Sequence, residues 1–184
     1  MRTPRAATMF LAIGVLCACA PSSPPDPDPA AVVKGFYGTY LSLHPTGVPE
    51  EVQLSKLRPY LSDSLVALFR DADAAETAYR KRTNNEQPPL VEGDLFTSLF
   101  EGASAFEVLP AKVKGDRASC LVRFSYQDPN PKYSTRWRDR VFLVKGASGW
   151  AIDDIEYMGD WQFMHKGRLR DLLAQVIKDG AANP

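Results

Sequence analysis

The sequence predicts an α+β domain, with N-terminal helices packed on a curved antiparallel sheet of about four strands and a closing C-terminal helix. Three observations predict it. Apolar residues recur at helical spacing over residues 33–79, alternate with polar residues over residues 120–126, and return to helical spacing over residues 169–177. Helices that precede a run of strands are typical of the α+β class. The 184 residues are 45% apolar, which is enough for one core, so residues 31–180 are expected to form a single domain.

The first predicted helix begins near residue 30 and ends at the His44-Pro45 pair, because a residue that precedes proline disfavours the helical conformation. A short helical piece follows and is interrupted near Pro59. Ser62 or Asp63 is expected to cap the longer helix that comes next, since both side chains can accept from free backbone N–H groups. The apolar faces of the first and the longer helix are made by Val33, Phe36, Tyr37, Tyr40, Leu41, Leu65, Leu68, Phe69, Ala72 and Tyr79.

A short helix is expected within residues 90–106, with two acids in its first turn, where the helix dipole favours negative charge. Its inward side chains are Leu95, Leu99 and Phe100, and its acids are Glu92 and Asp94. The pattern then predicts four strands, at residues 108–114, 120–126, 137–145 and 150–157. The last helix is expected over residues 166–178, with Gly180 suited to its C-terminal cap.

One end of the predicted sheet gathers acids and aromatics. If Val122 faces Val141, and Leu143 faces Ile152, cross-strand partners on one face place five such residues together. These candidate ligand-binding residues are Tyr126, Trp137, Asp139, Asp154 and Glu156. Carboxylates crowded beside aromatics would have at least one raised pKa, as ligand-binding and catalytic acids often do.

A structural interpretation stands beside this one. Acids at the open end of a sheet are often solvated, or pair with arginines on neighbouring strands, and the opposite face of these strands carries arginines. They are Arg123, Arg136, Arg138 and Arg140. A one-residue slip in register would move every side chain of a strand to the other face.

The N-terminus predicts a secreted, lipid-anchored protein. Arg2 and Arg5 precede an apolar stretch that is too short to span a bilayer comfortably, as in a signal peptide over residues 1–18. The run Leu16-Cys17-Ala18-Cys19 resembles a bacterial lipobox, which implies cleavage after Ala18 and acylation of Cys19, including a palmitate-type chain. An ordinary cleaved signal with incidental cysteines is the alternative. Residues 19–30 are rich in proline and are expected to form an extended tether.

Charge and cysteine content limit the partners. Loss of the first 18 residues leaves 20 basic residues against 22 acidic ones, a net charge of −2, so nucleic acid is not an expected partner. Cys120 would be the one remaining free thiol, expected as a small buried side chain in a domain without disulfides. Ala20 follows the predicted lipidated cysteine, which in a bacterium with two membranes favours the outer membrane, facing the periplasm.

Two stretches carry a resemblance to a known family. At "EGDLFTSLFEGASAF" and "GWAIDDIEYMGDW" the chain resembles bacterial envelope proteins catalogued as domain of unknown function 3828. The resemblance covers roughly Val32 to Leu173 and implies a cone-shaped domain of the nuclear-transport-factor-2-like or cystatin-like type. The family has no agreed activity, so the resemblance implies no catalytic residues.

No motif of a known catalytic class is present, and neither catalytic residues nor a cofactor are predicted. The two histidines, His44 and His165, are far apart in the sequence, which disfavours a metal site. The leading hypothesis is a membrane-tethered binding or accessory module of the envelope. One alternative is a small-pocket enzyme or ligand carrier that uses the acidic and aromatic end of the sheet. Another is an immunity or inhibitor protein that acts on a cell-wall enzyme.

Overall fold

A computed structural model describes residues 28–162 and 164–182. Four α-helices and two short 3₁₀ turns lie within these ranges. The helices are α1 (Pro29–Leu43), α2 (Glu51–Leu57), α3 (Asp63–Arg82) and α4 (Leu169–Ala181), and the 3₁₀ turns are η1 (Arg58–Tyr60) and η2 (Pro131–Tyr133). In this part of the chain, no helix combines the length and the apolarity that crossing a bilayer requires. The predicted signal peptide and most of the tether lie outside the described residues.

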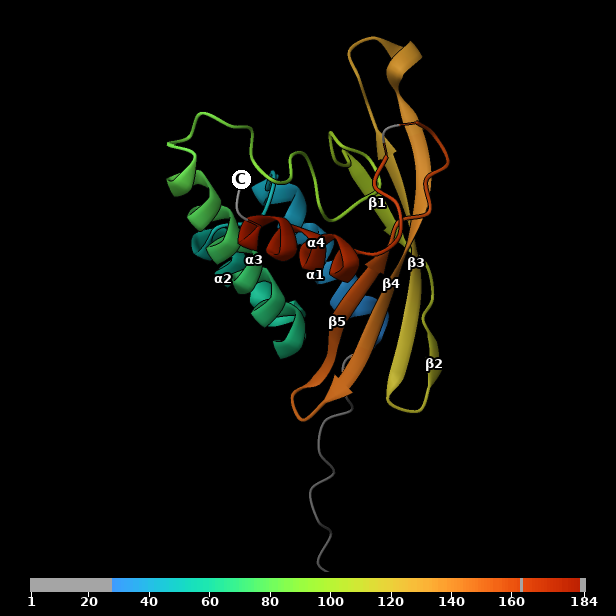
Figure 1. The fold of residues 1–184 in the computed structure, drawn as a ribbon. Coiled ribbons are helices and arrows are strands. Elements are labelled where there is room, and N and C mark those ends of the chain that lie inside the picture. Colours follow the sequence, from blue (N-terminus) through green and yellow to red (C-terminus); the bar gives the residue numbers. More distant parts are fainter. Residues whose placement is uncertain (1–27, 163, 183–184) are drawn as a thin grey trace, which may run out of the picture.

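The five strands form one antiparallel sheet. They are β1 (Ala105–Val108), β2 (Lys112–Lys114), β3 (Arg117–Tyr126), β4 (Thr135–Gly146) and β5 (Gly149–Glu156). Their order is β1-β3-β4-β5, and β2 pairs with β3 beyond the end of β1. The helices lie on one side of the sheet, and the other side carries no helix (Figure 1). The predicted α+β class, with helices on one face and a closing C-terminal helix, is confirmed.

The helix ends follow from local sequence. The Asp28 carboxylate accepts from the backbone N–H of Ala30 at 3.0 Å, and Pro29 opens α1 with a backbone angle suited to a first turn. The Ser62 hydroxyl accepts from the backbone N–H of Leu65 at 3.1 Å, so Ser62 is the predicted cap of α3. His44 ends α1 in the left-handed conformation, with a φ of 42°.

Helix α1 runs along the inner face of the sheet (Figure 1). It begins toward the end of the sheet that holds the β4–β5 turn (Figure 1). Farther along, the Tyr37 ring packs edge-on against Phe124 at 4.9 Å, and the Tyr40 hydroxyl accepts from the backbone N–H of Ala103. The helix therefore ends beside the loop that precedes β1.

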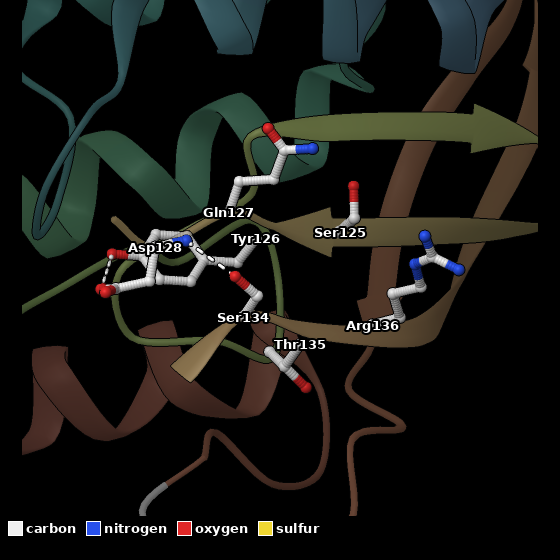
Figure 2. Close-up of a pocket in the computed structure, with 7 residues that line it drawn as sticks. All are labelled: Ser125, Tyr126, Gln127, Asp128, Ser134, Thr135 and Arg136. Atoms are coloured by element: carbon white, nitrogen blue, oxygen red, sulfur yellow. Dashed lines mark hydrogen bonds between the residues drawn. The ribbon is translucent and has the colours of Figure 1, made fainter. Parts of the chain in front are cut away.

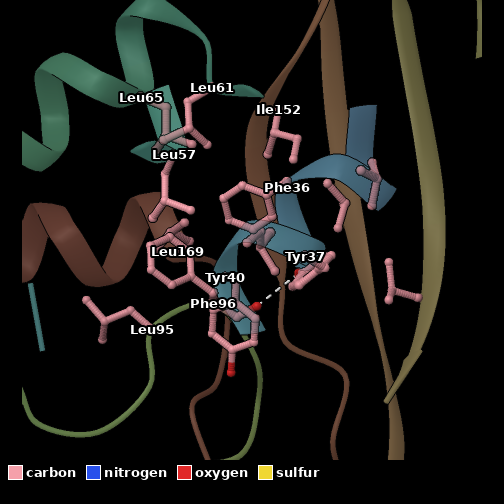
Figure 3. Close-up of a cluster of buried hydrophobic side chains, with 14 of the residues drawn as sticks. Phe36, Tyr37, Tyr40, Leu57, Leu61, Leu65, Leu95, Phe96, Ile152 and Leu169 are labelled. Carbon is pink, nitrogen blue, oxygen red and sulfur yellow. Dashed lines mark hydrogen bonds between the residues drawn. The ribbon is translucent and has the colours of Figure 1, made fainter. Parts of the chain in front are cut away.

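The hydrophobic core lies between the helices and the sheet (Figure 3). Its largest fully buried side chains come from every layer: Phe36, Tyr37, Tyr40, Leu54, Leu57, Leu65, Phe69, Leu95, Phe96, Leu143, Ile152 and Ile155. The buried Tyr37 hydroxyl in this core is satisfied, because it donates to the Phe96 carbonyl at 2.9 Å.

The short helix expected within residues 90–106 is wrong. This segment is an irregular loop up to residue 104, although Leu95 and Leu99 point inward as predicted. A few of its backbone groups bond to one another without forming a helical ladder, and others bond to side chains of the loop and of neighbouring segments. Phe100 is 47% exposed rather than buried. Gly93 and Gly102, with φ of 77° and 82°, give the loop turns that other residues rarely adopt.

Two further sequence expectations are corrected. The single strand expected at residues 108–114 is two strands, separated at Pro110, which cannot donate to a ladder. Gly180 lies inside α4 rather than at its cap. A Cβ at Gly180 would lie 2.8 Å from the Ala75 Cβ of α3, so this glycine allows the two helices to approach closely.

The strand register differs from the expected one in two ways. Between β3 and β4 it is shifted by two residues, so that Val122 faces Asp139. A two-residue shift leaves each side chain on its predicted face. Between β4 and β5, Leu143 faces Ile152 as predicted, but a bulge between Phe142 and Leu143 then changes the pairing.

Candidate functional site

The structure brings together two of the five predicted site residues. The Trp137 indole Nε1–H donates to the Asp139 carboxylate at 3.0 Å, and both side chains are buried. Tyr126 lies farther along the sheet, at the end of β3, where its hydroxyl donates to Asp128 at 3.4 Å (Figure 2). Trp137, Asp139 and Tyr126 lie at the end of the sheet where the sequence predicted a site.

The other two acids lie elsewhere. Beyond the bulge Asp154 faces Phe142, and Glu156 faces Arg140. The Asp154 carboxylate is 3.4 Å from the Arg168 guanidinium; burial raises its pKa, against the lowering effect of its bonds and of that arginine. Glu156 forms an ion pair with Arg140 at 2.6 Å. The expected common face of Asp139, Asp154 and Glu156 is therefore wrong, because the bulge is invisible in the alternating pattern.

Asp139 joins three segments of the chain. Its carboxylate accepts from the backbone N–H and the hydroxyl of Ser98, from the backbone N–H of Met158 at 2.9 Å, and from the Trp137 indole. Burial raises the pKa of Asp139, and the hydrogen bonds oppose that rise. Ser98 leads directly into residues 99–101, and Met158 leads into residues 161–162. Asp139 therefore holds the two segments that border the end of the sheet.

These segments and the β3–β4 hairpin enclose a hollow of about 750 Å³, which we name the aromatic groove. Its lining residues are Leu99, Phe100, Glu101, Tyr126, Asp128, Lys132, Tyr133, Thr135, Trp161 and Gln162. Phe100 and Tyr133 are 47% and 61% exposed, although large aromatic side chains are usually covered. Four rings from three separate segments converge here, flanked by polar side chains.

A second hollow, of about 470 Å³, adjoins the aromatic groove at the base of the hairpin (Figure 2). The two hollows share Tyr126, Asp128 and Thr135. The hairpin loop is held by its own side chains: the Ser134 hydroxyl accepts from the backbone N–H of Asp128 at 3.1 Å, and the Asp128 carboxylate from that of Asn130 at 2.8 Å. The loop that presents Tyr133 is thus internally braced.

The floor of the aromatic groove is continuous with the core. The Trp161 ring packs edge-on against Trp137 at 5.7 Å, and Trp137 stacks on Phe124 at 5.4 Å. Phe124 in turn contacts Tyr37 of α1. A ring that rests on such a series loses little freedom when a ligand covers it, which favours binding.

Comparison with known proteins gives one similarity. No family model matches the chain, so the resemblance to domain of unknown function 3828 is not confirmed, and no solved structure matches it. The "Uncharacterized lipoprotein YbjP" of Escherichia coli (strain K12) is 28% identical over 144 residues, which cover 77% of this chain and 73% of the relative. The chain is similar to a bacterial lipoprotein.

A second buried acid, Asp94, was expected in the first turn of a short helix. It instead accepts from the backbone N–H of Phe96 at 3.1 Å and from the Thr97 hydroxyl at 2.6 Å, within the loop before β1. Burial raises its pKa to about 7, although these bonds and the Tyr40 hydroxyl lower it. The Asp94 carbonyl also bonds His165 at 2.7 Å, and burial lowers the pKa of that imidazole. The triplet Asp94–Phe96–Thr97 is the sequence signal of such a side-chain-braced turn.

The groups that line the groove can contact a ligand through stacking and hydrogen bonds. Across the described residues, no three side chains of His, Cys, Asp or Glu gather closely enough to hold a metal ion. Cys120 is 1% exposed, as predicted, and burial raises the pKa of its thiol to about 11, which disfavours the nucleophilic thiolate. The aromatic groove offers stacking surfaces with carboxylate, amide and ammonium groups beside them.

Proposed function

We propose that this protein is a membrane-tethered binding module of the bacterial cell envelope, with the aromatic groove as its ligand-binding surface. The observation that carries the proposal is the convergence of four aromatic rings on one hollow at the end of the sheet. Exposed aromatic side chains that line a concave surface of this size are typical of binding sites. Tyr126 is the predicted site residue that lines it, and Trp137 and Asp139 support it from below.

The tether is the second part of the proposal. Residues 1–18 act as a lipoprotein signal peptide, Cys19 carries the lipid, and residues 19–30 link it to the domain. Ala20 directs the protein to the outer membrane, where the domain faces the periplasm. The similarity to a bacterial lipoprotein supports this arrangement.

The chemistry of the groove favours a cell-wall glycan as the ligand. Sugar rings present apolar C–H faces that stack on aromatic rings, and hydroxyl groups that bond to carboxylate and amide oxygens. The groove supplies the rings of Phe100, Tyr133 and Trp161, with Glu101 and Gln162 beside them. A peptide that adds to a sheet edge would instead need a strand partner and pockets for alternate side chains.

The groove is tested by sedimentation with purified peptidoglycan sacculi, using the full-length mature protein in a nonionic detergent. We expect the wild type to sediment with the sacculi. Tyr133→Ala, which removes a ring that is 61% exposed, is expected to lower the affinity about 5-fold, and the double variant with Phe100→Ala more, because each stacking contact contributes about 0.5–1.5 kcal/mol beyond buried area.

Val52→Ala is the matched control, since Val52 is an apolar side chain, 71% exposed, on α2 and outside the groove. It should sediment like the wild type. Equal binding by wild type and the double variant would contradict the assignment of the groove. Binding of wild type to free peptides but not to sacculi would contradict the glycan as ligand.

Lipidation is tested separately by metabolic labelling with an alkyne fatty acid. The wild type should carry the label, and Cys19→Ala should lose it, because Cys19 is the proposed acceptor of the acyl chains. Cys120→Ala, which leaves the lipobox intact, is the control and should keep the label. A label that persists in Cys19→Ala would contradict the lipid anchor while leaving the groove untouched.

A further inference from the structure

The open face of the sheet concentrates positive charge at the same end as the aromatic groove. Arg123 of β3 lies directly opposite Arg138 of β4, and Arg136 is the next residue on that face of β4. Like charges that face each other across a strand pair destabilise a sheet. We name these three residues the arginine cluster. None of the helices that the structure describes covers this face (Figure 1).

Other charges of the protein leave much of the cluster uncompensated. Arg123 contacts Glu107 at 3.1 Å, but both side chains are more than half exposed. This ion pair is therefore weak, and another anion can replace Glu107. Within residues 28–162 and 164–182, Arg136 and Arg138 make no ion pair and no side-chain hydrogen bond. By contrast, Arg140, two residues after Arg138 in β4, is paired with Glu156 at 2.6 Å.

A hollow of about 460 Å³ borders the cluster. It is lined by Arg123, Phe124, Arg136, Trp137, Arg138, Met158, Gly159 and Asp160. It forms because β5 pairs with β4 only from residue 140 onward, so the first part of β4 lies beside residues 158–160 rather than beside a strand. Asp160 is the acid of the lining, and it lowers the net positive charge of the hollow.

From this geometry we infer that the arginine cluster is a binding site for a phosphate group. Guanidinium groups stay charged at every physiological pH, and their planar forks bind phosphate oxygens in pairs. A tetrahedral phosphate offers three oxygens and up to two charges to three arginines, whereas a carboxylate offers two oxygens and one charge. A bound phosphate would also relieve the repulsion between Arg123 and Arg138.

This inference does not rest on the proposed function. None of the three arginines lines the aromatic groove, so a glycan ligand and a phosphate ligand can be tested independently. In Figure 2, Arg136 lies at the opposite side of the labelled residues from Tyr126 and Asp128. A phosphate group on a soluble metabolite or on a lipid headgroup would meet the same three side chains.

The test is isothermal titration of the full-length mature protein, in a nonionic detergent, with inorganic pyrophosphate. We expect saturable binding that weakens with added salt. Arg138→Gln is expected to weaken it about 10-fold, because it removes a charge-assisted hydrogen-bond donor. Asp160→Asn is expected to strengthen it about 3-fold by removing the acid at the rim.

Arg70→Gln is the matched control, since it makes the same change in net charge at a half-exposed arginine of α3, on the helical side of the molecule. It should bind pyrophosphate like the wild type. Equal weakening by Arg70→Gln and Arg138→Gln would overturn the site, because only net charge would matter. Undetectable binding of both pyrophosphate and glycerophosphoglycerol, a phosphodiester headgroup, would also overturn it. Tighter binding of the headgroup would point to a lipid source, and tighter binding of pyrophosphate to a soluble one.

Discussion

Asp139→Ala is expected to lower the free energy of unfolding by about 3–5 kcal/mol. The substitution leaves the buried Trp137 indole N–H, the Ser98 backbone N–H and the Met158 backbone N–H without their acceptor. Each unsatisfied buried donor costs about 1–3 kcal/mol, and the removal of a desolvated carboxylate returns part of that cost. Urea unfolding followed by Trp fluorescence measures the change.

A control variant and a binding measurement test the same role of Asp139. Glu51→Ala removes an exposed carboxylate that is paired with Arg70, so it should lower the free energy of unfolding much less than Asp139→Ala does. Asp139→Ala should also weaken glycan binding in sedimentation, since Asp139 holds both walls of the aromatic groove. A loss of stability no larger than that of Glu51→Ala would show that Asp139 does not brace the end of the sheet.

The Asp94 carboxyl should contribute stability at about pH 4 that is lost as the pH rises to about 7. The folded state raises the pKa of Asp94 from 3.8 to about 7, so the folded protein binds a proton that the unfolded chain has released. Stability then decreases with pH across this window and is greatest below it. A shift of about 3 pKa units corresponds to about 4 kcal/mol at most.

Asp94→Asn should remove this part of the pH dependence, because the amide is never charged and still accepts from the Phe96 backbone N–H. The measurement is urea unfolding of both proteins at pH 4.5, 6 and 7.5, with the difference between them as the readout. His165 lies against the Asp94 carbonyl, and Tyr40 lies beside its carboxylate; both are present in both proteins, so their own titration cancels. Parallel curves for the two proteins would contradict a raised pKa of Asp94.

Periodicity was sufficient to predict the helices and most strands, because their apolar faces must be buried in any packing of this chain. The cap at Ser62 was predictable because it depends only on a hydrogen bond between residues close in sequence. The structure of the loop before β1 was not predictable from periodicity. Asp94 and Thr97 bond within the loop, and Ser98 bonds to the distant Asp139. The helical spacing of Leu95 and Leu99 cannot be distinguished from that arrangement by sequence alone.

The sequence predicted the end of the sheet where the candidate site lies better than it predicted the residues that line the site. Alternation placed Tyr126, Trp137 and Asp139 at the end of the sheet that holds the aromatic groove, and it did so despite a register error, since a two-residue shift preserves the face. The rings of Phe100, Tyr133 and Trp161 come from loops, where no periodicity tells an exposed ring from a buried one. An aromatic residue within a polar, proline-rich hairpin loop, as at Tyr133, was the available signal.

The direction of α1 sets how the ligand surface is presented. The helix begins toward the end of the sheet that holds the β4–β5 turn and ends beside the loop that forms one wall of the groove, and its 15 residues span about 22 Å (Figure 1). If Cys19 carries a lipid, as we propose, the anchor joins the domain through the first residue of α1. The length of α1 would then separate the point of attachment from the aromatic groove, so that the ligand surface lies at the far end of the domain from its anchor.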